Sequence, residues 1–275
     1  MVNDRTADAW AAWHAEREDA LTTEYGWLTL TSLTHIEAEP TSLPDFPGQW
    51  RTLHADNEGA RVAIIFAEGD EVTQDGTEVP TDTEITIDLP QGESDQSLQW
   101  HASRAEVAHR GAGVIVRVRN PHAQARQEFD GIPTWDFDER WICPATAVWD
   151  DEPTTITVPS AQEGLTSRLT RLGTLNVTLP GDQHAELVIT DAHGEPAVIF
   201  HDPTNGVSSP GWRIAPVISS DSEDSDEGGV YVDFTRSQIF PAHLTPYGTC
   251  PTPPVGNTVP IDVPAGEKAR EMRSA

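Results

Sequence analysis

The sequence predicts a mainly β protein, built as two β-sandwich-like or barrel-like halves. Short runs of alternating or apolar residues, separated by Gly, Pro and Asp turns, follow one another along most of the chain. One helical pattern stands near the N-terminus, and no later segment has convincing helical periodicity. No repeat of fixed period is present, which argues against a propeller or a solenoid. We expect three parts: an N-terminal helix in residues 1–24, a first β half in 25–150, and a second β half with a proline-rich tail in 151–275.

The helix is predicted over residues 4–21. Trp10, Trp13, Arg17 and Leu21 recur at helical spacing, so the two indoles lie on one stripe. Aromatic stripes of this kind usually pack against a core, so we expect the helix to cap the first β half. Tyr25-Gly26 interrupts the pattern, and extended structure is expected from Trp27 onward.

The first half contains clear strand signals. An apolar run in residues 60–66 and an alternating run in 84–89 each read as strands. Residues 72–79 read as a hairpin, because Asp75-Gly76 suits the positive φ angles of a type I′ turn. Residues 113–119 form a further strand, which stops at Asn120-Pro121, with a short turn possible in 121–128.

The second half is predicted to begin after residues 150–153, Asp-Asp-Glu-Pro, which read as a boundary. Before them, residues 135–149 are aromatic and irregular and suit a connection. After them the strand pattern resumes in three turn-linked pairs: 174–179 with 185–190, 186–190 with 197–200, and 214–218 with 230–234. The tail, residues 233–268, is too proline-rich for a helix and is expected to pack back on the sheet.

Composition limits the function classes. The chain has 17 basic and 45 acidic residues, a formal net charge of −28, so nucleic-acid and membrane-surface binding are disfavoured. This negative charge has two interpretations: it reflects a generally acidic proteome, or it forms a surface that recruits a cation or a basic partner. We expect a cytoplasmic protein, since no targeting segment and no run of about 18 apolar residues is present. Cys143 and Cys250 are expected to be free thiols.

Several blocks of sequence resemble a known family. They are residues 25–33, 46–50 (in the form of its actinobacterial members), 116–121, 200–206 and the tail 233–268, which ends in Ala-Gly-Glu-Lys. Together they are similar to the uncharacterised bacterial and archaeal family called domain of unknown function 1684. The resemblance implies no activity. Thr235, Ala242 and His201 depart from residues usual in that family, so a paired-cysteine role for Cys250 is not expected.

A cluster of arginines is the best candidate binding site. Arg117 and Arg119 share one face of a strand, because side chains at i and i+2 point the same way. Arg126 can return to them across the turn at Asn120-Pro121. Two or three guanidiniums on one face suit bidentate binding of a carboxylate or phosphate. The alternative is that they pair with the chain's own acidic residues.

A second cluster lies in the tail, where Asp233, Arg236, His243, Tyr247 and Cys250 fall close together. Asp233 and His243 could form an orienting carboxylate–imidazole pair with Tyr247 as a donor. The alternative is a tail whose polar groups simply satisfy one another, with Cys250 as a small buried apolar residue.

Metal and cofactor signals are weak. His193 and His201, with Asp191 and Asp202 beside them, lack any metal-ligand spacing, so no metal is expected. The acidic residues 221–227 lack the ligand spacing of a calcium loop. No nucleotide-binding loop, hydrolase elbow or kinase motif is present, and no cofactor is predicted.

Three hypotheses of function therefore stand. In the first, a small anionic ligand binds in a cleft between the β halves, held by Arg117, Arg119, Arg126 and Arg236, and His243 and Tyr247 close the pocket. In the second, the chain is an enzyme, a hydrolase or an isomerase, with His243 as a base oriented by Asp233 and Tyr247 as a donor. In the third, a β face docks a partner protein.

Overall fold

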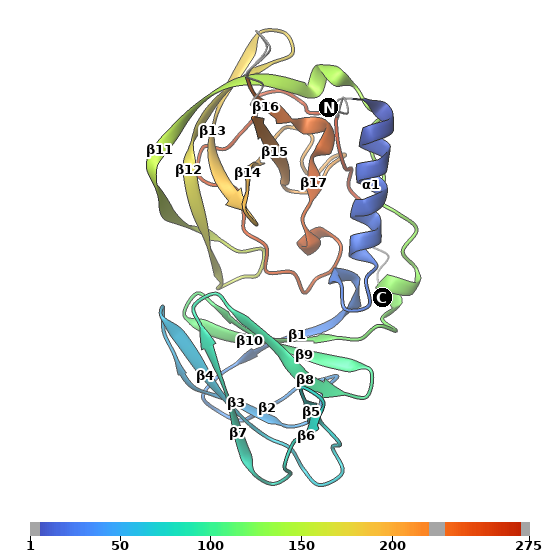
Figure 1. Ribbon diagram of the computed structural model, residues 1–275, viewed down its shortest axis with the longest axis vertical. Coiled ribbons are helices and arrows are strands. Elements are labelled where there is room, and N and C mark those ends of the chain that lie inside the picture. The colour runs from blue at the N-terminus through green and yellow to red at the C-terminus, as the bar shows by residue number, and fades with distance from the viewer. Residues whose placement is uncertain (1–5, 220–228, 271–275) are drawn as a thin grey trace.

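The computed structural model describes residues 6–219 and 229–270. The protein is mainly β, with two stacked β halves and one long N-terminal helix, as the sequence predicts (Figure 1). None of the helices in the described residues is long and apolar enough to cross a membrane.

Helix α1 spans Ala7–Leu21 and begins where the Thr6 side chain accepts a hydrogen bond from the amide of Ala9. The prediction that this helix caps the first half is wrong, because the helix runs along the second half (Figure 1). Trp10 Nε1 donates to the carbonyl of Thr235 at 2.7 Å, and Arg17 Nη2 donates to that of Ile239 at 3.0 Å. Two side chains of the predicted stripe thus donate hydrogen bonds to backbone carbonyls of the tail. These carbonyls lie more than 220 positions away in the sequence, so local patterns cannot reveal the contacts.

The first half holds two antiparallel sheets. Residues 27–29 form a short 3-10 helix, η1, rather than the predicted extended segment, before the strands begin. The six-stranded sheet has the order β1-β10-β9-β8-β5-β6, and the four-stranded sheet has the order β2-β3-β4-β7. In chain order the strands are β1 Leu30–Ile36, β2 Thr41–Ser42, β3 Gln49–Ala55, β4 Gly59–Ile65, β5 Thr73–Gln74, β6 Thr77–Glu78, β7 Glu84–Pro90, β8 Ser94–Trp100, β9 Ser103–Arg110 and β10 Gly113–Arg119.

The two sheets enclose an apolar core that includes Trp50, Phe66 and Leu98. The hairpin turn between β5 and β6 has φ values of 50° at Asp75 and 78° at Gly76, both positive as a type I′ turn requires. The predicted hairpin is therefore confirmed.

The second half is a closed antiparallel barrel. Six consecutive strands pair in order from β11 to β16, and β11 pairs with β16 to close the ring, while β17 adds to β15. Phe200, Val232 and Phe234 belong to its core. The strands are β11 Ile142–Pro159, β12 Thr166–Leu179, β13 Gln183–Ala192, β14 Glu195–Phe200, β15 Arg213–Ser219, β16 Val230–Asp233 and β17 Gln238–Ile239. The predicted hairpins β12–β13 and β13–β14 are confirmed.

The predicted boundary between the halves at residues 150–153 is wrong, because these residues lie inside β11. The register with β12 shifts between Trp149 and Thr154, so the intervening residues form a bulge without ladder partners. A bulge tolerates Pro153 and lets a long strand bend. The connection between the halves is instead residues 120–141, which hold the short helices α2, Gln124–Gln127, and η2, Glu139–Trp141. Residues 142–149 are therefore strand, not irregular connection.

The long β11–β12 hairpin of the second half packs against the first half. Beyond the bulge it leaves the barrel, and its tip reaches the first half, where Leu165 packs against Ile115 and Ala108. These two residues lie on the face of β10 and β9 that points away from the first core. The hairpin also bonds to the tail, since the amide of Ala161 donates to the carbonyl of Cys250 at 2.8 Å.

The tail packs back on the second half, as predicted. Val259, Val263 and Ala265 are buried in the barrel core. The side chain of Asn257 bonds to backbone groups of both Val188 and Ile199, which pins the tail across β13 and β14.

A buried ion pair fastens the same region. Arg213 and Asp202 are both fully buried, with 3.0 Å between Nη2 and Oδ1. Arg213 also donates to the carbonyls of Ala265 and Val263, at 2.6 and 2.9 Å. Asp202 accepts from the amide of Val263 at 3.0 Å. The block 200–206 and the tail are thus parts of one hydrogen-bonded network.

Gly266 is expected to tolerate no side chain. Its φ is 76°, and an added Cβ would lie 2.5 Å from the carbonyl oxygen of Ser237. Gly256 is a matched control, with φ of 93° and nothing within 4 Å of an added Cβ. Gly256→Ala should cost about 1–2 kcal/mol through backbone strain alone, and Gly266→Ala clearly more. Urea unfolding of both variants tests this, and equal costs would contradict the close packing of Gly266 on Ser237 within the tail.

Candidate functional site

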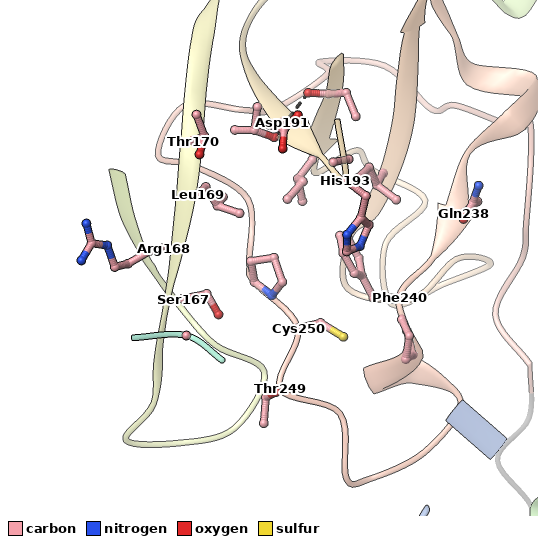
Figure 2. A pocket seen from close by; sticks show the side chains of 18 of the residues that line it. Ser167, Arg168, Leu169, Thr170, Asp191, His193, Gln238, Phe240, Thr249 and Cys250 are labelled. Atoms are coloured by element: carbon pink, nitrogen blue, oxygen red, sulfur yellow. Dashed lines mark hydrogen bonds between the residues drawn. The ribbon is translucent and has the colours of Figure 1, made fainter. Parts of the chain in front are cut away.

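A cavity of about 800 Å³ lies between the two halves. Figure 2 shows part of its lining, with Leu169 of β12, His193 of the β13–β14 turn, and Phe240 and Cys250 of the tail around it. The tail contributes residues 238–241 and 249–251, and the first half contributes Arg117. Both halves and the tail are therefore needed to form it.

Strand alternation explains which side chains reach the cavity. On β14, Val198 and Phe200 point into the barrel, so Ile199 points outward. Ile214 of β15 lies outside the barrel for the same reason. These two pack with Leu169 of the overhanging hairpin and with Phe240 of the tail. We call Leu169, Ile199, Ile214 and Phe240 the apolar wall.

Arg117 stands at a buried end of the cavity, with 1% of its side chain exposed. Its Nη2 pairs with Glu106, and Nη1 donates to Thr249 Oγ1 at 3.3 Å. Its guanidinium lies 5.2 Å from the ring centre of Trp27. The Nε hydrogen has no acceptor among the described residues. A buried guanidinium thus retains an unused donor beside a cavity.

Arg17 reaches the same cavity from α1. Its Nε is 3.4 Å from Glu267 Oε1, and Glu267 is fully buried. Burial raises the pKa of Glu267, although the charge of Arg17 opposes this. Ile239 holds Glu267 from the other side, by donating its amide to Oε2 at 2.7 Å. The tail residue Glu267 therefore positions Arg17.

Cys250 lies near both arginines. Burial raises the pKa of its thiol to about 11, while the charges of Arg117 and Arg17 act in the opposite sense. The thiol is therefore protonated at neutral pH, and it is a poor nucleophile. We call Arg17, Arg117, Thr249 and Cys250 the buried end of the cavity.

The charge of the lining is opposite to that of the chain. Four arginines line the cavity, Arg17, Arg110, Arg117 and Arg168, against two acidic residues, Asp191 and Glu195. The whole chain has 17 basic and 45 acidic residues. Behind the lining, the single carboxylate of Glu106 serves both Arg117 and Arg119. This leaves one positive charge in excess at the buried end.

Of the four arginines predicted to bind a ligand, Arg117 lines the cavity and the other three are not among its lining residues. Arg119 shares the face of Arg117, as predicted, but donates to Glu106 and to the carbonyls of Tyr25 and Gly26. Arg126 donates to the carbonyls of Thr22 and Pro121, at 2.9 and 3.0 Å. Arg236 pairs with Asp233 at 3.6 Å. These three are engaged by the local backbone or an adjacent carboxylate.

The predicted catalytic cluster is not assembled. Asp233 accepts from the amide and hydroxyl of Thr235, at 3.0 and 2.5 Å, and burial raises its pKa. His243 packs edge-on against Trp212 at 4.7 Å, and burial lowers its pKa. In the described part of the chain no bond joins Asp233 to His243. Tyr247 and His243 are not among the lining residues either.

The residues considered as weak metal-ligand candidates do not come together either. His193 is exposed at the rim, while the Nδ1 of His201 lies 2.8 Å from the carbonyl of Gly211, and Asp202 belongs to the Arg213 network. No group of three or more His, Cys, Asp or Glu within residues 6–219 and 229–270 is placed to hold a metal ion. The acidic residues 221–227 lie outside the described residues.

Sequence reasoning missed Arg17, Trp27 and Glu106 as site residues. The helical stripe includes Arg17, but nothing local shows that this stripe faces the tail. Glu106 is directly opposite Arg117 in the β9–β10 pairing. Oppositely charged residues often face each other on neighbouring strands, so Glu106 could have been identified as the partner of Arg117 if the strand register had been known.

Comparison with known protein families identifies the family of this chain. The model of the family described as "Protein of unknown function (DUF1684)" matches residues 127–268, more than half of the chain. The protein belongs to the DUF1684 family. This confirms the resemblance that the sequence blocks indicate. No curated protein matches the chain.

A solution NMR structure of an uncharacterised protein from Haloarcula marismortui is also similar to part of the chain. It is 27% identical, with a TM-score of 0.41, and the match covers 52% of this chain and 78% of that protein. The DUF1684 match itself contains the barrel and the tail, and therefore the apolar wall and Cys250. Arg17, Trp27 and Arg117 precede it. The cavity is thus formed where the matched segment meets the N-terminal half.

Proposed function

We propose that this DUF1684 protein binds a small anionic ligand in the cavity between its β halves, with Arg117 as the principal anchor. The observation that carries the proposal is the state of Arg117. It is buried, lines the cavity, keeps an unused Nε donor and shares its one carboxylate with Arg119.

Energetics favour an anion at this place. A buried charge without full compensation is unfavourable, and a bound carboxylate or phosphate would supply both the missing charge and an acceptor. Arg17, which is paired with Glu267, lines the same cavity. A volume of about 800 Å³ lies within the range of small-molecule sites.

The two other hypotheses have weaker support. The base pair of the enzyme hypothesis, Asp233 with His243, is not formed, and the nearby thiol of Cys250 has a raised pKa. The large exposed apolar residues of the described chain come from several elements, namely Leu53, Ile65, Val148, Trp149, Val207 and Val255. Neither observation points to a ligand or a partner as directly as Arg117 does.

A thermal-shift screen tests the proposal. Carboxylates, phosphates and sulfate are compared at constant ionic strength with chloride as the reference. A bound anion at about five times its Kd should stabilise the fold by about 1 kcal/mol, a rise of about 2–4 °C in melting temperature.

The matched variants are Arg117→Met and Arg119→Met. Each removes one guanidinium from the same carboxylate, Glu106, but only Arg117 lines the cavity. The shift should vanish in Arg117→Met, which removes the guanidinium that lines the cavity, and be smaller but still present in Arg119→Met, which removes the excess charge alone. A screen without any shift, or a shift that both variants keep, would overturn the proposal.

A further inference from the structure

Resting on that proposed function, we infer that the ligand is a monocarboxylate with an apolar body, such as a medium-chain or aryl-substituted acid. The carboxylate would lie at the buried end, and the body would lie along the apolar wall. Three features of the cavity carry this inference.

The first feature is the amount of charge at the buried end. Arg117 and Arg119 share Glu106, which leaves one excess positive charge, and Arg17 is matched by Glu267. One carboxylate balances the excess of the cluster formed by Arg117, Arg119 and Glu106. Arg110, which also lines the cavity, is held by the carbonyls of Gly92, Glu93 and His109. The planar carboxylate also suits the fork geometry of a guanidinium. Arg17 Nε already faces Glu267 at 3.4 Å, so the carboxylate is assigned to Arg117.

The second feature is the apolar wall. Leu169 and Ile199 are buried, and Ile214 and Phe240 pack with them from two further segments. These side chains come from β12, β14, β15 and the tail and pack into one apolar cluster that lines the cavity. A hydrophilic anion such as citrate would leave this surface without matching contacts, while an alkyl or aryl body would remove it from water.

The third feature is the rim. Asp191 and His193 of the β13–β14 hairpin and Arg168 of β12 line this part of the cavity (Figure 2). Glu195, in the same hairpin as Asp191, lines it as well. Outside the buried end the lining holds two carboxylates, Asp191 and Glu195, and two guanidiniums, Arg110 and Arg168, so this part of the cavity has no net positive charge that would favour a second acidic group on the ligand.

Isothermal titration of the full-length chain at fixed ionic strength tests the inference with five probes. They are decanoate, its uncharged analogue decanol, the cation decyltrimethylammonium, and the hydrophilic anions citrate and phosphate. Decanoate should bind at least about tenfold more tightly than each of the others, since loss of one charged hydrogen-bonding group changes affinity by about that factor or more.

Two kinds of variant assign the contacts. Arg117→Met should weaken decanoate binding at least about tenfold, and Arg119→Met, which keeps the guanidinium that lines the cavity, should weaken it clearly less. Ile214→Thr changes the wall without touching an ion pair and should weaken decanoate binding by about threefold or more. It therefore provides a test even if Arg117→Met fails to fold.

The outcomes separate this inference from the proposed function. If citrate or phosphate binds in an Arg117-dependent way and decanoate does not, the ligand class is wrong and the anion site stands. If decanol binds as well as decanoate, the assignment of the carboxylate to Arg117 is overturned. If no anion binds, both the inference and the proposed function fail.

Discussion

Replacement of Asp202 by Ala is expected to lower the free energy of unfolding by about 3–5 kcal/mol, the usual cost of removing one partner of a buried ion pair. Arg213 would be left in the interior without a counterion. The amides of Thr204 and Val263 would also lose an acceptor. Because these bonds hold the tail, the loss should appear in urea unfolding at neutral pH as a large drop in midpoint.

The exposed pair Arg61–Asp88 is the matched control. Both side chains are more than half exposed, and exposed ion pairs contribute little to stability. Asp88→Ala should leave the urea midpoint close to that of the wild type. A small effect of Asp202→Ala, similar to that of Asp88→Ala, would show that the block 200–206 does not fasten the tail.

Replacement of Glu106 by Gln is the second large expected effect, again about 3–5 kcal/mol. It would leave both Arg117 and Arg119 buried without their carboxylate. Burial alone would raise the pKa of Glu106, but the two guanidiniums outweigh burial and hold it below its usual value. The stabilisation is therefore complete above the pKa of an unfolded Glu and is lost as the pH falls through the lower, folded-state pKa.

The pH dependence gives this prediction its test. The stability difference between wild type and Glu106→Gln should be constant from pH 7 to about 5 and shrink below about pH 4. Urea unfolding of both proteins across this range measures it. Glu84→Gln, at the exposed Arg51–Glu84 pair, is the control. A difference that stays unchanged down to pH 3 would contradict an ionised Glu106 between the two arginines.

Local patterns were enough for much of the fold. Period-2 alternation and Asp-Gly or Pro-Gly-Asp turns identify β10 and the hairpins, since strand and turn chemistry depends on adjacent residues. The same rule correctly places Arg117 and Arg119 on one face. The bulge at residues 150–153 was mistaken for a boundary, because acidic residues and proline are typical of both.

The contacts that define the site are long-range. Arg17 meets Ile239 across 222 positions, and Arg117 meets Thr249 across 132. These contacts depend on how the helix and the first half pack against the tail, and no local pattern encodes that packing. The sequence also does not show that only Arg117 lines the cavity, because local patterns do not identify the backbone and tail partners of Arg117 and Arg119.

A crystal structure of the protein grown with 4-bromobenzoate would test the anion site most directly. Bromine can be located by its anomalous scattering, which fixes the orientation of the probe. We expect the carboxylate within hydrogen-bonding distance of Arg117, about 3 Å, and the bromine beside the apolar wall. A cavity without the probe at saturating concentration, or a carboxylate bound elsewhere and not at Arg117, would contradict the account.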